Sequence, residues 1–160
     1  IKMRVEDVRL EYKSWIIPQQ NSKNRTEHHI PLCELSVNLL RRTIGNRTSG
    51  PVFRIHERTL SNTLARYEGD DQFDGRFTAH DLRRTFATRI FTVVPTADEN
   101  HVRRVLNHKH KSDGALKNYN HHEYMEQKRA LLEAWSDHIE NLIHNAGAFC
   151  RSGFLDGGAG

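Results

Sequence analysis

The stretch TAHDLRRTFAT, residues 78–88, contains the signals that decide the fold of this chain of 160 residues. Thr78 is a favourable residue for the position before a helix, and Asp81 stands where a carboxylate can return a hydrogen bond to that cap. Leu82, Phe86 and Ile90 follow at intervals of four residues. This spacing predicts a helix over about residues 79–92, with these three side chains as its buried stripe.

The same helix carries His80 and Arg83 on another face. Residues three apart in a helix are neighbours, so an imidazole and a guanidinium would stand together near the helix N-terminus, where an anion is favoured. Arginine suits phosphate because its planar group donates two parallel hydrogen bonds. An alternative is purely structural: Arg83 pairs with a carboxylate such as Asp81, and His80 is an ordinary surface residue.

The flanking segments predict an α+β fold, mainly helical with a small antiparallel sheet near the N-terminus. Two short strands are expected within residues 5–18 and a third over 28–32, and the polar turn over 19–27 carries Lys23 and Arg25. Further helices are expected from about Ser36 to Ile44, from Asp98 onwards, and over 121–145. We expect one folded domain over residues 1–145 and a flexible, glycine-rich tail over 146–160.

The composition permits a nucleic-acid partner without requiring one. Lys and Arg outnumber Asp and Glu by 24 to 20, which gives a net charge of +4. The two cysteines, Cys33 and Cys150, form no disulfide framework, and no apolar run approaches the roughly 18 residues of a membrane span, so we expect a cytoplasmic protein. The 11 histidines include pairs that could bind zinc, but their spacings match no closed structural site.

Four segments in order resemble the tyrosine recombinases, the family of phage and genomic-island integrases. HDLRRTFAT, residues 80–88, resembles the family's HxxR box, and VLNH, residues 105–108, resembles its leucine-glycine-histidine box with Asn107 in place of the glycine. Tyr119 follows at the position of the nucleophile and opens a segment, 119–135, that resembles the family's C-terminal helix. SKNR, residues 22–25, resembles the β-hairpin that presents a catalytic lysine. The resemblance spans about residues 5–137.

The resemblance implies DNA strand cleavage and rejoining through a 3′-phosphotyrosyl intermediate, with no metal or other cofactor. It assigns the attack to Tyr119 and the protonation of the 5′ oxygen to Lys23, while His80 assists the tyrosine proton. Arg83 and His108 would hold the phosphate. Tyr124 is the rival nucleophile, although its place on the apolar stripe of the last helix favours a core role. Further candidates for contacts to the DNA backbone are Arg25, Arg84, Lys109 and Lys111.

The family also uses an earlier arginine in a Thr-Gly-x-Arg-x-x-Glu context, and the sequence contains no such context. Arg4 stands too close to the first strand to take that role, so we expect the chain to begin after that segment. The alternative is a natural relic that has lost the arginine, and in either case we expect the chain to be nearly inactive by itself. The implied partners are double-stranded attachment-site DNA and three further copies of the intact protein, encoded by a phage or mobile element. Two alternatives are a non-catalytic DNA-binding remnant of an integrase and a type IB topoisomerase.

Overall fold

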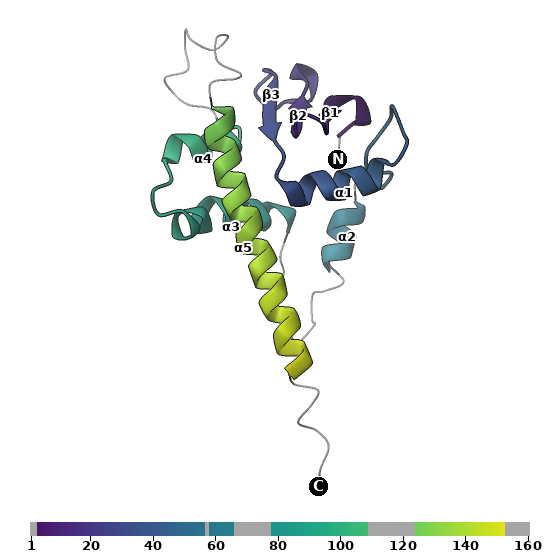
Figure 1. Ribbon diagram of the computed structural model, residues 1–160. Coiled ribbons are helices and arrows are strands. Elements are labelled where there is room, and N and C mark those ends of the chain that lie inside the picture. Colours follow the sequence, from purple (N-terminus) through teal and green to yellow (C-terminus); the bar gives the residue numbers. More distant parts are fainter. Residues whose placement is uncertain (1–2, 57, 66–77, 109–123, 153–160) are drawn as a thin grey trace.

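The computed structural model describes residues 3–56, 58–65, 78–108 and 124–152. Two short 3-10 helices, three strands and five α-helices follow one another in this part of the chain, and they confirm the α+β class (Figure 1). The elements are η1 (Val5–Asp7), β1 (Val8–Arg9), β2 (Ser14–Ile17), η2 (Gln19–Asn21), β3 (His28–Pro31), α1 (Glu34–Ile44), α2 (Thr59–Ala65), α3 (Ala79–Val93), α4 (Glu99–Val105) and α5 (Met125–Ser152). Among these helices, none is both long and apolar enough to cross a membrane.

The three strands form one antiparallel sheet in the order β1-β2-β3. Trp15 of β2 stands opposite Val8 on one side and Ile30 on the other. The sheet confirms the predicted strands except at Val5, which lies in η1 and is buried in the core rather than paired in a strand. The connection from β2 to β3 contains the turn that carries Lys23.

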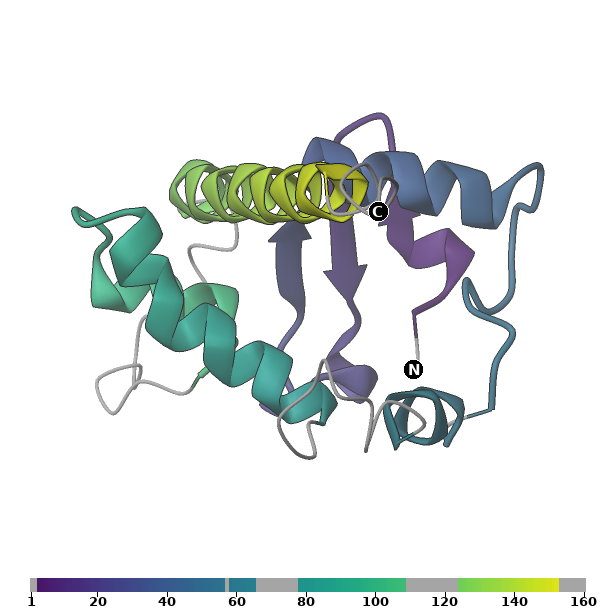
Figure 2. The same ribbon diagram turned by 90° about the horizontal axis from the view of Figure 1, so that it is seen from below.

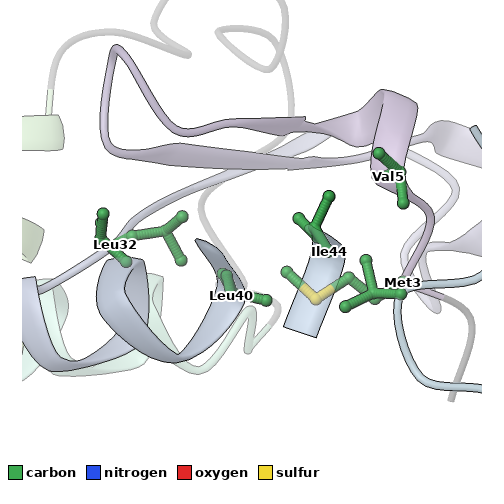
Figure 3. Packing of buried hydrophobic residues seen from close by; sticks show 7 residues of the cluster. Met3, Val5, Leu32, Leu40 and Ile44 are labelled. Carbon is green, nitrogen blue, oxygen red and sulfur yellow. The ribbon is translucent and has the colours of Figure 1, made fainter. Parts of the chain in front are cut away.

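The first hydrophobic core lies between the sheet and α1 (Figure 3). The apolar face of α1 is buried there, with Val37, Leu40 and Ile44 at most 6% exposed, and Gly45 ends the helix with a positive φ of 57°. The cluster consists of Met3, Val5, Leu32, Val37, Leu40, Ile44 and Val52.

The second core joins α3, α4 and α5 through Phe86, Ile90, Val102, Leu106 and Leu131. Phe86 also meets Trp135 edge to face, with the ring centroids 5.4 Å apart. The prediction that Leu82 belongs to this buried stripe is wrong, because its side chain is 56% exposed. Periodicity identifies the face of a helix, but it does not tell how far along the helix the neighbouring elements extend, and Leu82 lies in the first turn.

Helix α5 connects the two halves of the molecule, with the sheet and α1 on one side and α3 and α4 on the other (Figures 1 and 2). Lys128 is only 6% exposed and donates its ammonium group to the backbone carbonyl of His29 in β3. Arg129 reaches the carbonyl of Leu32 at 3.5 Å. The helix continues to Ser152, beyond the end expected near residue 145, because one internal glycine, Gly147, costs only about 1 kcal/mol and no proline follows. The proposed boundary between domain and tail stays a prediction.

Replacing Ile90 tests the second core. Ile90 is fully buried, so we expect Ile90→Ala to lower the free energy of unfolding by about 2–5 kcal/mol through lost contacts and an unfilled cavity. Arg89→Ala, one position earlier and exposed, should change it by less than about 0.5 kcal/mol. Urea unfolding measures both, and equal effects would contradict the assignment of Ile90 to the core.

We expect Lys128 to make the free energy of unfolding depend on pH in the alkaline range. Burial, followed by the charge of Arg104, lowers the pKa of Lys128 from 10.5 to about 8. Between these two values the unfolded chain binds more protons at this residue than the folded chain, so raising the pH from about 8 towards 10.5 should increase the contribution of Lys128 to stability. Lys128→Met should remove that increase, whereas Lys13→Met, at a half-exposed lysine, should retain it. Urea unfolding at pH 7.5 and 10 gives the comparison.

Candidate active site

The N-terminus of α3 is fixed by a carboxylate at its third position. Asp81 accepts hydrogen bonds from the backbone N–H and the hydroxyl of Thr78, at 2.9 and 2.8 Å. The bond from the hydroxyl is the main reason that the pKa of Asp81 is lowered. Arg84 approaches the same carboxylate only at 3.5 Å, and its side chain is 72% exposed, so this ion pair adds little.

Arg83 points from α3 to the end of α4. Its guanidinium donates to the backbone carbonyl of Leu106, whose side chain is buried in the second core. Arg83 therefore does not pair with Asp81, which was the structural alternative, since the Asp81 carboxylate contacts Thr78 and Arg84 instead. A guanidinium has five N–H donors, and a single carbonyl leaves others for an anion.

The turn after α4 is a Schellman motif that ends on His108. The N–H of Asn107 donates to the carbonyl of Arg104 at 3.2 Å, and the N–H of His108 donates to the carbonyl of Arg103 at 2.9 Å. Asn107 has a positive φ of 53°, the left-handed conformation that this motif places just after a helix. Glycine and asparagine adopt this conformation more readily than other residues, so asparagine suits this position.

His108 experiences positive charge from three different elements. Partial burial lowers its pKa first, and the charges of Arg83 in α3, Arg103 in α4 and Lys23 in the β2–β3 connection lower it further. Two other predicted site residues, Lys23 and Arg83, are thus each close enough to His108 to act on it electrostatically. A protonated imidazole is disfavoured among these cations, and a phosphate would be attracted to them.

The turn that carries Lys23 is tied to Asn107 by its two neighbours. The side-chain amide of Asn24 donates to the backbone carbonyl and to the side-chain oxygen of Asn107, at 2.8 and 2.9 Å. Asn107 in turn donates to the hydroxyl of Ser22 at 3.2 Å. The sequence did not predict this contact between Asn107 and the two neighbours of Lys23, because no periodicity links residues more than 80 positions apart.

A comparison with protein families identifies the family of the chain. The model of the phage integrase family matches residues 1–126. The chain belongs to the phage integrase family. Membership implies site-specific recombination, the tyrosine recombinase class of enzyme and DNA as substrate. No curated protein and no solved structure gives a match.

The remaining predicted site residues of the chain differ in how they are placed. His80 is exposed in the first turn of α3, one turn before Arg83. Arg25 is exposed in the β2–β3 connection and has a positive φ of 53°. Tyr119, Lys109 and Lys111 lie outside the described residues.

Tyr124, the alternative candidate for the nucleophile, is half-buried against α4. The guanidinium of Arg104 lies over its ring, 4.0 Å from the centroid, and the ring of His101 is 5.5 Å away. These contacts favour a packing role for Tyr124.

Potential metal ligands do not gather in the described part of the integrase. Within residues 3–56, 58–65, 78–108 and 124–152, no group of three or more His, Cys, Asp or Glu side chains is arranged to hold an ion. The histidines that the zinc hypothesis would add, His110, His121 and His122, lie outside these ranges.

The electrostatic link between Arg83 and His108 can be measured directly. Arg83→Gln should raise the pKa of His108, because it removes a positive charge that disfavours the imidazolium. Arg84→Gln changes the adjacent position, whose side chain faces Asp81, and should leave the pKa of His108 unchanged. NMR titration of the histidine ring protons gives both values, and equal shifts in the two variants would contradict this geometry.

Proposed function

We propose that residues 1–145 form the catalytic part of an integrase that cleaves and rejoins DNA through a 3′-phosphotyrosyl intermediate. The observation that carries the proposal is that hydrogen bonds bring three separate segments together at His108: Arg83 donates to the Leu106 carbonyl, and both neighbours of Lys23 bond to Asn107. The positive charges of Arg83 and Lys23 both lower the pKa of His108 there. Their chemistry fits a scissile phosphate: a guanidinium for the nonbridging oxygens, an imidazole as a further donor, and an ammonium for the leaving group.

Arg83 and His108 are the proposed phosphate ligands. The bond from Arg83 to the Leu106 carbonyl fixes its guanidinium beside the turn that ends on His108. Because the donors are held before the substrate arrives, little reorganisation opposes the stabilisation of negative charge on the phosphate oxygens. Arg25, Arg84, Lys109 and Lys111 are proposed to contact the DNA backbone, where cationic side chains position a duplex without reading its sequence.

The proposed reaction is a displacement at phosphorus that conserves the energy of the phosphodiester. The hydroxyl oxygen of Tyr119 forms a bond to phosphorus and passes its proton towards His80. The bond from phosphorus to the 5′ oxygen breaks, and the ammonium of Lys23 supplies the proton that this oxygen takes up. Rejoining reverses the step with a 5′ hydroxyl as the nucleophile. General acid or base assistance of this kind contributes typically about 10²–10⁴ in rate.

The active assembly on attachment sites is proposed to be a tetramer, and the chain of 160 residues by itself is proposed to be nearly inactive. The family's earlier arginine has no counterpart in the sequence context that it requires, and one missing electrostatic donor costs about 3–4 kcal/mol of transition-state stabilisation in other enzymes. Covalent capture of DNA in a single turnover is therefore a better test than multiple turnover.

Tyr119→Phe tests the proposed nucleophile. The chain is incubated with a pool of random-sequence duplexes that carry a nick, so that a short cleaved strand diffuses away and the protein stays on the DNA. We expect the wild-type chain to form a slow adduct that survives detergent, Tyr119→Phe to form none, and Tyr124→Phe to form it normally.

The other outcomes of this experiment identify the alternatives. Adduct formation by Tyr119→Phe but not by Tyr124→Phe would reverse the assignment. Binding without any adduct in the wild-type chain would favour a non-catalytic DNA-binding remnant. Rejoining only to the original strand, and never to a second duplex with a free 5′ hydroxyl, would favour a topoisomerase.

A further inference from the structure

Asn107 connects two parts of the candidate site that are far apart in sequence. It is the residue between Leu106, which accepts a hydrogen bond from Arg83, and His108. Its own carbonyl and side chain contact residues on both sides of Lys23. We propose that Asn107 is a positioning residue whose side-chain amide holds the turn bearing Lys23 beside His108; this inference rests on the proposed role of Lys23.

The contacts form a clamp on the Lys23 turn. Ser22, on one side of Lys23, accepts from the Asn107 amide at 3.2 Å, and Asn24, on the other side, donates to the side-chain oxygen of Asn107 at 2.9 Å. The backbone of the turn is closed by a bond from the Arg25 N–H to the Ser22 carbonyl, at 3.0 Å. Lys23 itself is exposed, so these bonds fix its backbone and leave its ammonium free.

The clamp is partly shielded from water. Ser22 is 7% exposed, and Asn24 and Asn107 are both half-buried. Hydrogen bonds between half-buried groups are replaced by bonds to water less easily than those on an open surface, because water has less access to their donors and acceptors. A turn of polar residues would otherwise sample many conformations, and the clamp restricts that sampling where a proton has to be delivered.

Asparagine is suited to both tasks at this position. The backbone needs a positive φ, which glycine and asparagine accept most readily. Glycine would keep the Schellman turn and the bond from Asn24 to the backbone carbonyl of residue 107, but it would lose both side-chain bonds. Asn107→Gly is therefore a selective variant, because it removes the clamp without changing the backbone conformation that places His108.

The first test needs no DNA cleavage. The positive groups that lower the pKa of His108 are Arg83, Arg103 and Lys23, and NMR titration follows this pKa in the wild-type chain, Asn107→Gly, Lys23→Ala and the double variant. Both single variants should raise it, because each takes the Lys23 charge away from the imidazole. In the Lys23→Ala background, Asn107→Gly should add no further change.

A shift caused by Asn107→Gly that persists without Lys23 would overturn the inference, because Asn107 would then act on His108 by another route. No shift in Asn107→Gly would overturn it as well. Asn46→Gly removes the same side chain from an exposed turn after α1 and should leave the pKa of His108 unchanged, which separates the clamp from a general effect of the substitution.

The second test distinguishes failure of the clamp from failure of the proposed role of Lys23. A duplex recovered from the random pool is prepared with sulfur in place of the bridging 5′ oxygen at the cleaved position, since a thiolate departs without needing a proton. On the oxygen substrate we expect Asn107→Gly to form adduct about 10-fold more slowly, a fraction of the 10²–10⁴ of a general acid, and Lys23→Ala to be slower still. On the sulfur substrate both variants should match the wild-type chain.

Each departure from this pattern has one meaning. If Asn107→Gly forms adduct slowly on both substrates, or at the wild-type rate on the oxygen substrate, the inference about Asn107 is overturned. The proposed role of Lys23 as the acid is unaffected by that result. If Lys23→Ala forms adduct at the wild-type rate on the oxygen substrate, or stays slow on the sulfur substrate, Lys23 is not the general acid. The proposed reason for the clamp then fails as well.

Discussion

The packing of α3 against the end of α4 is the constraint on which the candidate site depends. Phe86 and Ile90 share one hydrophobic core with Leu106 and Leu131, so the helix that carries Arg83 has a fixed relation to the turn that ends on His108. The hydrogen bond from Arg83 to the Leu106 carbonyl adds a polar interaction to this packing of α3 against the end of α4. Removing buried apolar groups here would loosen the positions of Arg83 and His108 without changing either side chain.

A second joint brings the lysine-bearing hairpin to that site. Lys128 of α5 donates to the His29 carbonyl in β3. Burial lowers the pKa of Lys128 to about 8, because desolvation disfavours its ammonium form. The β2–β3 connection is therefore held at its strand by α5 and at its turn by Asn107. Lys23 gains a defined position relative to His108 from contacts made by its neighbours rather than by its own side chain.

Much of this organisation can be predicted from the sequence. The apolar spacing predicts α1 and α3, Thr78 and Asp98 predict two helix starts, and the order of the HxxR segment, the VLNH segment and the hairpin indicates the phage integrase family that the family comparison confirms. The exposure of Leu82 was not predictable, because it depends on where neighbouring helices end. The continuation of α5 to Ser152 differs from the predicted end near residue 145, because a single glycine inside a helix costs too little to end it.

The sequence by itself determined the family, the α+β class and the chemical types available at the site, because these follow from local propensity, periodicity and the order of short motifs. Only the tertiary structure decided that Arg83 bonds to the Leu106 carbonyl rather than to Asp81, and that Asn107 meets both neighbours of Lys23. The physical reason is that these are single contacts between segments more than 20 and more than 80 residues apart. Such contacts leave no periodic trace along the chain and are set by how the two cores pack on α5.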